Sequence, residues 1–124
     1  MARIIVDTSS ILFGISCRKD VFAIASRSFR NATITVSKGV IRELSGISKN
    51  RGVRGSTAKA ALALIRVKNV KVDTDNGSVD SWILRIAARH NNSIVITNDT
   101  ALFKKAESAN PNVFKLSKSG LLRR

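Results

Sequence analysis

Two acidic residues follow apolar runs that have the composition of buried strands. The sequence RIIVDTSS places Asp7 after one such run, and SIVITNDTALFKK places Asp99 after another. In a parallel α/β sheet, active sites form outside the carboxyl ends of the strands, near the switch in strand order. The repeated pattern therefore predicts that Asp7 and Asp99 share a site. An Asp at this position is also a good helix N-cap, so capping remains the alternative for each residue.

Two further acids can join this pair. Asp80 lies in the first turn of a helix predicted from residue 78 to residue 90, where the helix dipole stabilises a carboxylate whatever else it does. Glu43 falls between the core positions Val40 and Leu44, at the edge of a buried helix face. It is the only acid between Lys38 and Lys71, a stretch rich in Lys and Arg.

Three or four carboxylates in one place repel each other unless a divalent cation neutralises them. Oxygen ligands suit Mg²⁺ or Mn²⁺, which retain waters for a substrate phosphate. Zinc is disfavoured because the chain has one Cys and one His. The lone His90 is better placed as a dipole partner near the end of its helix than as a catalyst.

Other chemistries lack their residues. The first strand is followed by DTSSILFG and not by a Gly-rich phosphate-binding loop. No Ser–His–Asp set can be assembled around the single His. An aspartyl-phosphate phosphatase would require a second Asp two residues after Asp7, where Ser9 stands.

The charge of the chain indicates an anionic partner. Twenty-two Lys and Arg face eight Asp and Glu, which gives a net charge of +14 on 124 residues. Nucleic acid is the leading candidate. An anionic membrane surface or a basic surface that serves solubility are the alternatives. The single Cys17 excludes an internal disulfide and favours a reduced, cytoplasmic protein. No stretch approaches the ~20 apolar residues of a membrane span, and a strand from Arg3 leaves no room for a signal peptide.

Strands and helices are predicted to alternate along one domain, residues 1–124. The predicted strands are short and rich in Val and Ile: Arg3–Val6, Thr33–Val36, Val70–Val72, Ile94–Thr97 and Val113–Leu116. The predicted helices cover Asp20–Phe29, Ser37–Leu44, Thr57–Ile65, Ser78–His90 and Thr100–Ala106. This alternation indicates right-handed crossovers and a largely parallel sheet covered on both faces.

One Gly- and Ser-rich stretch, residues 45–59, interrupts the pattern. A linker between domains is disfavoured because the flanking pieces are too small to be domains. We therefore expect a mobile basic loop that contacts RNA phosphates through four side chains. These are Lys49, Arg51, Arg54 and Lys59.

The sequence resembles the PIN domain family. The resemblance runs from RIIVDTSSIL through VSKGVIREL and VDSWILRIAARHNNSIVITNDTALFKKA to LSKSGLLRR. TND after an apolar strand is moderately specific, and the four acids in this order strengthen the assignment. Within the family, the chain is most similar to short archaeal proteins related to the PIN nucleases of small-subunit ribosomal RNA processing. Toxins of the VapC type are a more distant likeness.

The resemblance implies a three-layer α/β/α fold with a five-stranded parallel sheet. It also implies a ribonuclease site whose catalytic acids are Asp7, Glu43, Asp80 and Asp99. Asp7, Asp80 and Asp99 would hold one or two Mg²⁺ or Mn²⁺ ions, and Ser9 and Asn98 match positions that often orient the acids or the metal-bound water. Relatives often carry a further Asp where this chain has Ser81, a departure that bears on a second metal site.

The leading interpretation is a metal-dependent endoribonuclease that hydrolyses RNA phosphodiester bonds, with ribosomal RNA processing as its setting. The alternative from a different class is a non-catalytic RNA-binding PIN module of a ribosome-assembly particle. A toxin ribonuclease is a further alternative, and it would require a cognate antitoxin. Whether the chain forms a homodimer stays open.

Overall fold

The central strands form from apolar runs that are buried along their length. The computed structural model describes residues 2–124, and in it Ile4, Ile5, Val6, Val95 and Ile96 have no exposed surface. Val and Ile suit such positions because their branched side chains pack well on a pleated surface that is covered on both faces. The strands are β1 (Arg3–Val6), β2 (Thr33–Ser37), β3 (Lys71–Asp73), β4 (Ile94–Ile96), β5 (Val113–Leu116) and β6 (Leu122–Arg123).

The sheet has the order β3-β2-β1-β4-β5-β6. Strand β1 lies at its centre and pairs in parallel with both β2 and β4. The chain builds outward from β1 first to one side, through β2 and β3, and then to the other, through β4 and β5. The switch in strand order therefore falls between β1 and β4, where an open α/β sheet forms its crevice.

The five-stranded parallel sheet implied by the resemblance is wrong in one respect. A sixth strand, β6, pairs antiparallel with β5, so the sheet is mixed. A tight turn reverses the chain: Ser117 Oγ accepts from the Leu121 N–H, and the Gly120 N–H donates to the Ser117 carbonyl at 3.0 Å. Gly120 has φ +89°, a left-handed conformation that glycine adopts without strain. A two-residue strand is too short to give a periodic sequence signal.

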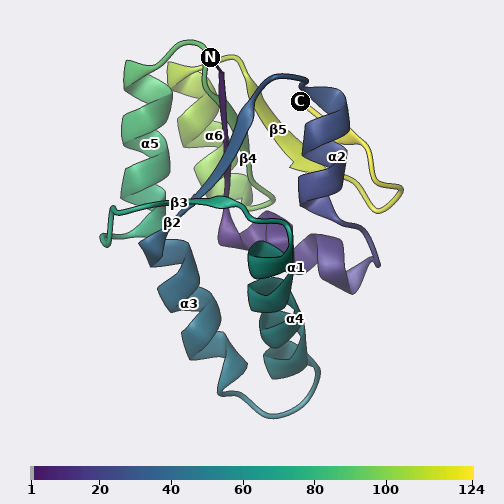
Figure 1. The fold of residues 1–124 in the computed structure, drawn as a ribbon. Helices are drawn as coiled ribbons and strands as arrows, with labels where there is room; N and C mark the ends of the chain where they lie inside the picture. Colours follow the sequence, from purple (N-terminus) through teal and green to yellow (C-terminus); the bar gives the residue numbers. More distant parts are fainter. Residues whose placement is uncertain (1) are drawn as a thin grey trace.

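Helices flank the sheet (Figure 1). Helix α5 packs against α6, while α1 and α3 both contact α4. No helix within the described part of the chain has the length and apolarity needed to cross a membrane. The helices are α1 (Thr8–Ser16), α2 (Val21–Ser28), α3 (Lys38–Ser48), α4 (Val53–Val67), α5 (Val79–Arg89) and α6 (Thr100–Ala109).

Residues 45–59 are mostly helical, so the predicted mobile loop is wrong. Helix α3 continues to Ser48 and α4 begins at Val53, leaving a short turn between them. The glycines serve this turn: Gly52 has φ +82°, and a Cβ on Gly55 would lie 1.8 Å from the Asn50 carbonyl oxygen. The two helices form a hairpin that projects beyond the sheet (Figure 1). Glycines that look like loop residues in the sequence are here required by a left-handed conformation at Gly52 and by close packing at Gly55.

The segment after β1 is a helix that the sequence analysis did not predict. Helix α1 follows Asp7 directly and buries Ile11 and Gly14. Its apolar residues run almost consecutively, without the 3–4 spacing that marks an amphipathic helix. Gly14 is buried where the chain turns back, and a Cβ there would lie 2.9 Å from the Lys19 carbonyl oxygen.

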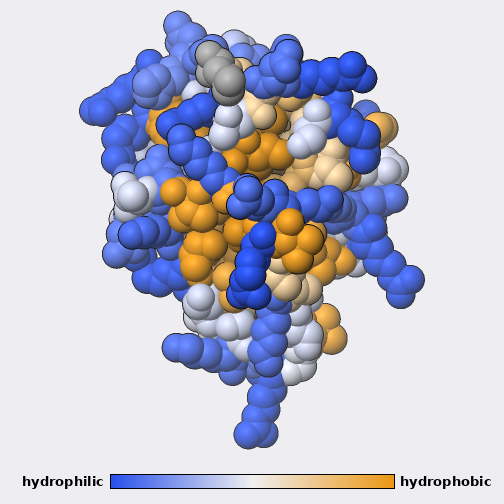
Figure 2. All heavy atoms as spheres, in the orientation of Figure 1, coloured by the Kyte–Doolittle hydropathy of each residue, from blue (hydrophilic) through white to orange (hydrophobic). Residues whose placement is uncertain are grey.

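The face crossed by β3 carries an apolar groove (Figure 2). The groove has a volume of about 760 Å³ and lies between α3, α4 and β3. Figure 2 shows its apolar floor interrupted by hydrophilic side chains. The lining includes Ile41, Leu62, Ile65 and Val72 together with Lys38, Arg42 and Arg66. None of the four predicted catalytic acids lines it.

Candidate active site

Asp7 stands at the switch point of the sheet. Its backbone N–H donates to the Ile96 carbonyl at 2.9 Å, so the β1–β4 ladder continues one residue past the strand and brings Asp7 beside the end of β4. The Asp7 residue is only 5 % exposed. The sequence RIIVD thus places a carboxylate at the switch point, where open α/β sheets form a crevice.

The Asp7 carboxylate is held by two hydroxyl groups. Thr97 Oγ1 donates to Asp7 Oδ2 at 2.8 Å, and Ser9 Oγ donates to the same oxygen at 2.5 Å. Asp7 occupies the N-cap position of α1, yet its side chain makes no capping hydrogen bond. The capping alternative therefore does not explain Asp7, whose carboxylate is held instead by one hydroxyl from α1 and one from the residue after β4.

Burial raises the pKa of the Asp7 carboxyl above its ordinary value of 3.8. Desolvation is the largest cause because the charged form loses contact with water. The hydrogen bonds from Ser9 and Thr97 lower the pKa, and the negative charge of Asp80 raises it. The effect of Asp80 means that α5 brings its first turn within electrostatic range of Asp7. A nearby cation would relieve both the desolvation and the repulsion.

Asp99 also stands at the switch point, but its side chain caps a helix. Asp99 Oδ1 accepts from the Leu102 N–H at 3.0 Å, which stabilises the start of α6. The Asp99 backbone N–H donates to Thr97 Oγ1 at 3.1 Å. The Thr97 hydroxyl thus binds the Asp7 carboxylate and the Asp99 backbone at once, and it fixes the two residues relative to each other.

Asp80 and Glu43 are exposed on neighbouring helices. Ser78 caps α5 by accepting from the Ser81 N–H at 3.1 Å, so the Asp80 side chain is not used as the cap. Glu43 lies on α3, between the buried residues Val40 and Leu44 as predicted. Asp7 is thus linked to Asp80 by the effect of its charge and to Asp99 through Thr97, while the place of Glu43 at this site stays a prediction.

No basic side chain neutralises these acids within residues 2–124. The two ion pairs found there join Lys68 to Asp20 and Arg85 to Asp75. This is informative in a chain with 22 Lys and Arg. No three of the described acids, His or Cys come close enough together to form a metal-binding group. The site is therefore an open set of carboxylates without a cationic partner.

Ser9 and Asn98 are built into the same framework. Besides contacting Asp7, Ser9 Oγ accepts from the Asn98 N–H at 3.0 Å. The Asn98 side chain turns away from the acids: its Oδ1 accepts from Ser10 Oγ and from the Leu116 N–H, and its Nδ2 donates to the Leu116 carbonyl. Asn98 thereby ties α1, β4 and β5 together at the edge where the acids lie.

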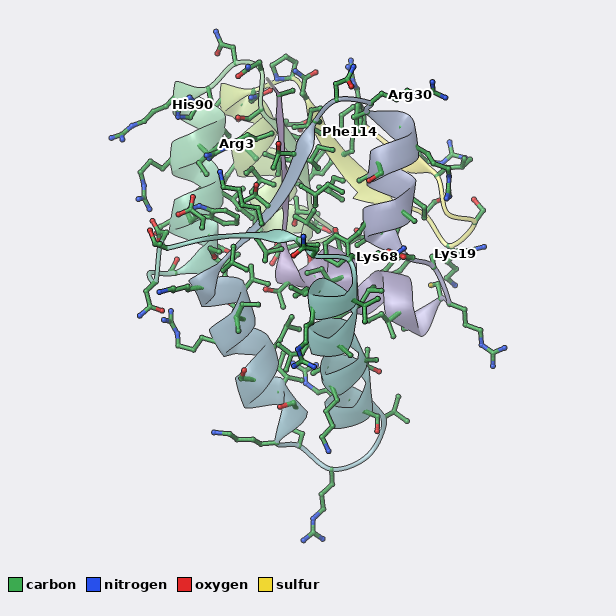
Figure 3. All side chains as sticks on the ribbon, viewed as in Figure 1. Arg3, Lys19, Arg30, Lys68, His90 and Phe114 are labelled. Atoms are coloured by element: carbon green, nitrogen blue, oxygen red, sulfur yellow. The ribbon has the colours of Figure 1, made fainter. Side chains whose placement is uncertain are left out.

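The four predicted RNA-binding residues are all exposed, on the turn of the α3–α4 hairpin and on the first part of α4. In Figure 3, nitrogen-tipped side chains extend outward from the free end of this hairpin. The residues are Lys49, Arg51, Arg54 and Lys59.

Thr97 is the residue of the site to which sequence analysis gave no role. It is fully buried and contacts both acids of the switch point. The available signal was a hydroxyl residue between the apolar run and Asp99. It was counted as part of the strand because Thr is a common strand residue.

The fold and the sequence were compared with those of known proteins. Among solved structures, the PIN domain endonuclease Utp24 matches with a TM-score of 0.78 at 19% identity, over 98% of this chain and 91% of that one. A domain of a functionally unknown protein from Methanocaldococcus jannaschii DSM 2661 matches with a TM-score of 0.63 at 20% identity, over 93% and 91%. None of the curated protein sequences matches significantly. The family model described as PIN like domain matches residues 4–119, and the chain therefore belongs to the PIN-like domain family.

Proposed function

We propose that this protein is a metal-dependent endoribonuclease that cuts RNA at the crevice between β1 and β4. The observation that carries the proposal is the Asp7 carboxylate. It is buried at the switch point, held by Thr97 and Ser9, close to Asp80, and without a basic partner in the described chain. Perturbed carboxylates in a crevice are typical of catalytic sites.

The residues present fit a hard divalent cation. The donors are carboxylate oxygens, and the raised pKa of Asp7 reflects burial and repulsion that a bound cation would relieve. Asp7, Asp80 and Asp99 would hold Mg²⁺ or Mn²⁺. When bound, the cation would supply charge stabilisation at the phosphate and a more acidic water.

The protein itself would supply orientation and binding. Thr97 and Ser9 fix the Asp7 carboxylate, so that little reorganisation accompanies the reaction. Glu43 would orient the attacking water from α3. The basic residues of the hairpin would contact the RNA backbone, which carries the dense negative charge that a net charge of +14 favours. The setting we propose is ribosomal RNA processing, from the resemblance to the nucleases of that process.

A non-catalytic RNA-binding module is the second candidate. It is favoured by the absence of a closed three-acid group among residues 2–124, and by Ser81, which is exposed beside Asp80. The positive charge serves this function equally well.

Cleavage tests discriminate between these functions. Wild-type protein is incubated with single-stranded and structured RNA in Mg²⁺, in Mn²⁺ and in EDTA, and Asp7→Asn is assayed beside it. We expect cleavage only with metal and a loss of about a hundredfold or more in Asp7→Asn. Asp20→Asn is the matched control, since Asp20 caps α2 and pairs with Lys68 outside the site. If wild type and Asp7→Asn are equally inactive in every condition, the binding module replaces the enzyme.

The role of the hairpin is tested by the salt dependence of binding. Lys49→Gln combined with Arg54→Gln should reduce the slope of log affinity against log salt by roughly one unit or more. A control with the same loss of charge is Arg27→Gln with Arg30→Gln, on and after α2. Figure 3 shows Arg30 at the end of the molecule far from the hairpin. Equal slopes in the two double variants would make the hairpin a spectator.

A further inference from the structure

A small pocket opens directly beside Asp99. Its volume is about 210 Å³, and its lining begins at Thr97 and Asp99 at the end of β4. Pockets that take drug-sized ligands measure roughly 300–1,000 Å³, so this one suits a single flat group. Because Thr97 also donates to Asp7, the pocket shares a residue with the candidate active site.

The pocket has an aromatic wall on α6. Phe103 lines it and is partly buried, and its backbone N–H donates to the Asp99 carbonyl at 2.8 Å. Residues four apart lie on the same face of a helix, so Phe103 follows Asp99 along one stripe. The helical rise places Phe103 about 6 Å further along the axis.

Basic side chains from three segments surround this wall. Lys104 comes from α6, Lys115 from β5 and Arg124 from the end of the chain, and all three are exposed. The Arg124 guanidinium carbon lies 5.3 Å above the Phe114 ring centre, and its Nη2 donates to Asn112 Oδ1 at 3.4 Å. These contacts hold Arg124 against β5, where Figure 3 places Phe114. Glu107 is the one acid in the lining besides Asp99.

We propose that this pocket binds one unpaired nucleotide of the RNA strand next to the cut. Its base stacks on Phe103, and Lys104, Lys115 and Arg124 contact the neighbouring phosphates. Aromatic stacking inside a basic groove is how proteins hold single-stranded nucleic acid. A paired base cannot enter so small a pocket, so the proposal makes the substrate single-stranded on the α6 side of the acids. It rests on the proposed function for its connection to cleavage, but the binding itself requires no metal.

The test is metal-free binding of a fluorescein-labelled oligouridine of nine nucleotides, measured in EDTA by anisotropy. A blunt RNA hairpin with the same number of phosphates is the second probe. Phe103→Leu should weaken oligouridine binding by about fivefold or more and leave hairpin binding within about twofold, since stacking on an aromatic side chain is lost. Phe22→Leu is the control, because it is the same chemical change at a buried side chain that lies outside the pocket lining.

Two further measurements keep the test independent of the stability of Phe103→Leu. Irradiation of wild type with an oligouridine containing 5-iodouridine should crosslink at Phe103, as mapped by peptide mass spectrometry. Lys115→Gln should lower the salt slope of oligouridine binding, and Glu107→Gln should tighten binding by removing a repulsion with phosphate.

The outcomes separate this inference from the proposed nuclease. Crosslinking at Phe103 without any cleavage in Mn²⁺ would retain the pocket and remove the enzyme. Cleavage with the same KM in Phe103→Leu as in wild type, or crosslinks only at other segments, would remove the pocket and retain the enzyme. Wild-type protein that binds no oligouridine, or binds hairpin and oligouridine equally with no effect of Phe103→Leu, also overturns the inference.

Discussion

Asp7 and Asp99 follow the same local sequence pattern, yet their side chains have different surroundings. Both come after an apolar strand and immediately before a helix. The Asp99 carboxylate caps its helix and is exposed, while the Asp7 carboxylate is buried, caps nothing and is held by Ser9 and Thr97. The two residues differ in their position in the sheet, because Asp7 follows the central strand β1 and Asp99 follows β4, the next strand toward the edge.

The comparison shows that one residue type at equivalent positions can serve two physical purposes. Asp99 stabilises its local element through a short-range hydrogen bond, so its cap would exist in many folds. Asp7 is desolvated, and the hydrogen bonds from Ser9 and Thr97 offset only part of that cost to stability, because the pKa of Asp7 stays above its ordinary value. Such a cost indicates function more strongly than a satisfied cap does.

The largest effect is expected on RNA cleavage, when the proposed metal ligand Asp99 loses its charge but keeps its capping hydrogen bond. Asp99→Asn keeps the size of the side chain and an oxygen for the Leu102 N–H. It should nevertheless lower metal-dependent RNA cleavage by about a hundredfold or more, because a charge beside the phosphate is lost. Single-turnover cleavage in Mn²⁺ measures this, with metal-free RNA affinity expected to hold or rise. Full activity in Asp99→Asn would make Asp99 a cap and nothing else.

The hydrogen bonds that connect Asp7 and Asp99 can be removed by a substitution at Thr97. Thr97→Val removes the donor to Asp7 and the acceptor for the Asp99 N–H, and it should reduce the free energy of unfolding by about 1–3 kcal/mol. Thr8→Val is the matched control: Thr8 Oγ1 is buried and has no hydrogen-bond partner in the described chain, so its removal should be neutral or stabilising. Urea unfolding of both variants decides, and an equal effect of the two would mean that the Thr97 hydroxyl links nothing.

The stability of the metal-free protein should depend on pH through Asp7. Because the pKa of Asp7 is raised in the folded state, its contribution to stability is greatest below 3.8 and is lost as pH rises through the folded pKa. Asp7→Asn should therefore be more stable than wild type at pH 7 in EDTA, with the gap shrinking as pH falls toward 3.8. One proton limits the slope to about 1.4 kcal/mol per pH unit. Denaturant titrations from pH 3 to pH 8 measure the gap, and a constant gap would contradict the burial argument.

The smallest effect concerns the cap itself. Asp99→Ala should cost about 1 kcal/mol of unfolding free energy through the lost hydrogen bond to Leu102, whereas Asp99→Asn should change it by only a few tenths. Thermal unfolding in EDTA compares the two variants. If both are as stable as wild type, the hydrogen bond between Asp99 and Leu102 contributes nothing to stability. Asp99 would then differ from Asp7 in geometry but not in its effect on folding.

Patterns that depend on neighbours in the sequence predicted the fold well. The strands at Arg3–Val6 and Val113–Leu116 have their predicted bounds, because a buried strand has a short apolar run as its sequence pattern. Helix α5 differs from the predicted helix by only one residue at each end. The prediction is this close because the 3–4 spacing is regular and Ser78 caps the helix. The resemblance to the PIN family is confirmed by the family match over residues 4–119.

Features set by tertiary packing were not predictable in the same way. Helix α1 has no amphipathic spacing. Gly52 and Gly55 indicated a loop, because the sequence shows neither the positive φ of Gly52 nor the close contact of Gly55 with Asn50. Within the site, the sequence named the acids but gave no role to Thr97, whose contacts are with residues 90 positions away and two positions away. A side chain that acts by joining distant segments leaves no periodic signal.

The hairpin of β5 and β6 has a consequence for self-association. A free strand edge offers unpaired N–H and C=O groups to another molecule, and β6 covers the edge that β5 would otherwise present. The opposite edge, β3, is only three residues long and begins at an exposed lysine, which limits what a second chain could add there. Removal of the residues after Leu116 would therefore uncover Val113–Leu116 as a template for intermolecular pairing. Residues 117–124 thus limit strand pairing between molecules. They also include Arg124, which lines the pocket beside Asp99.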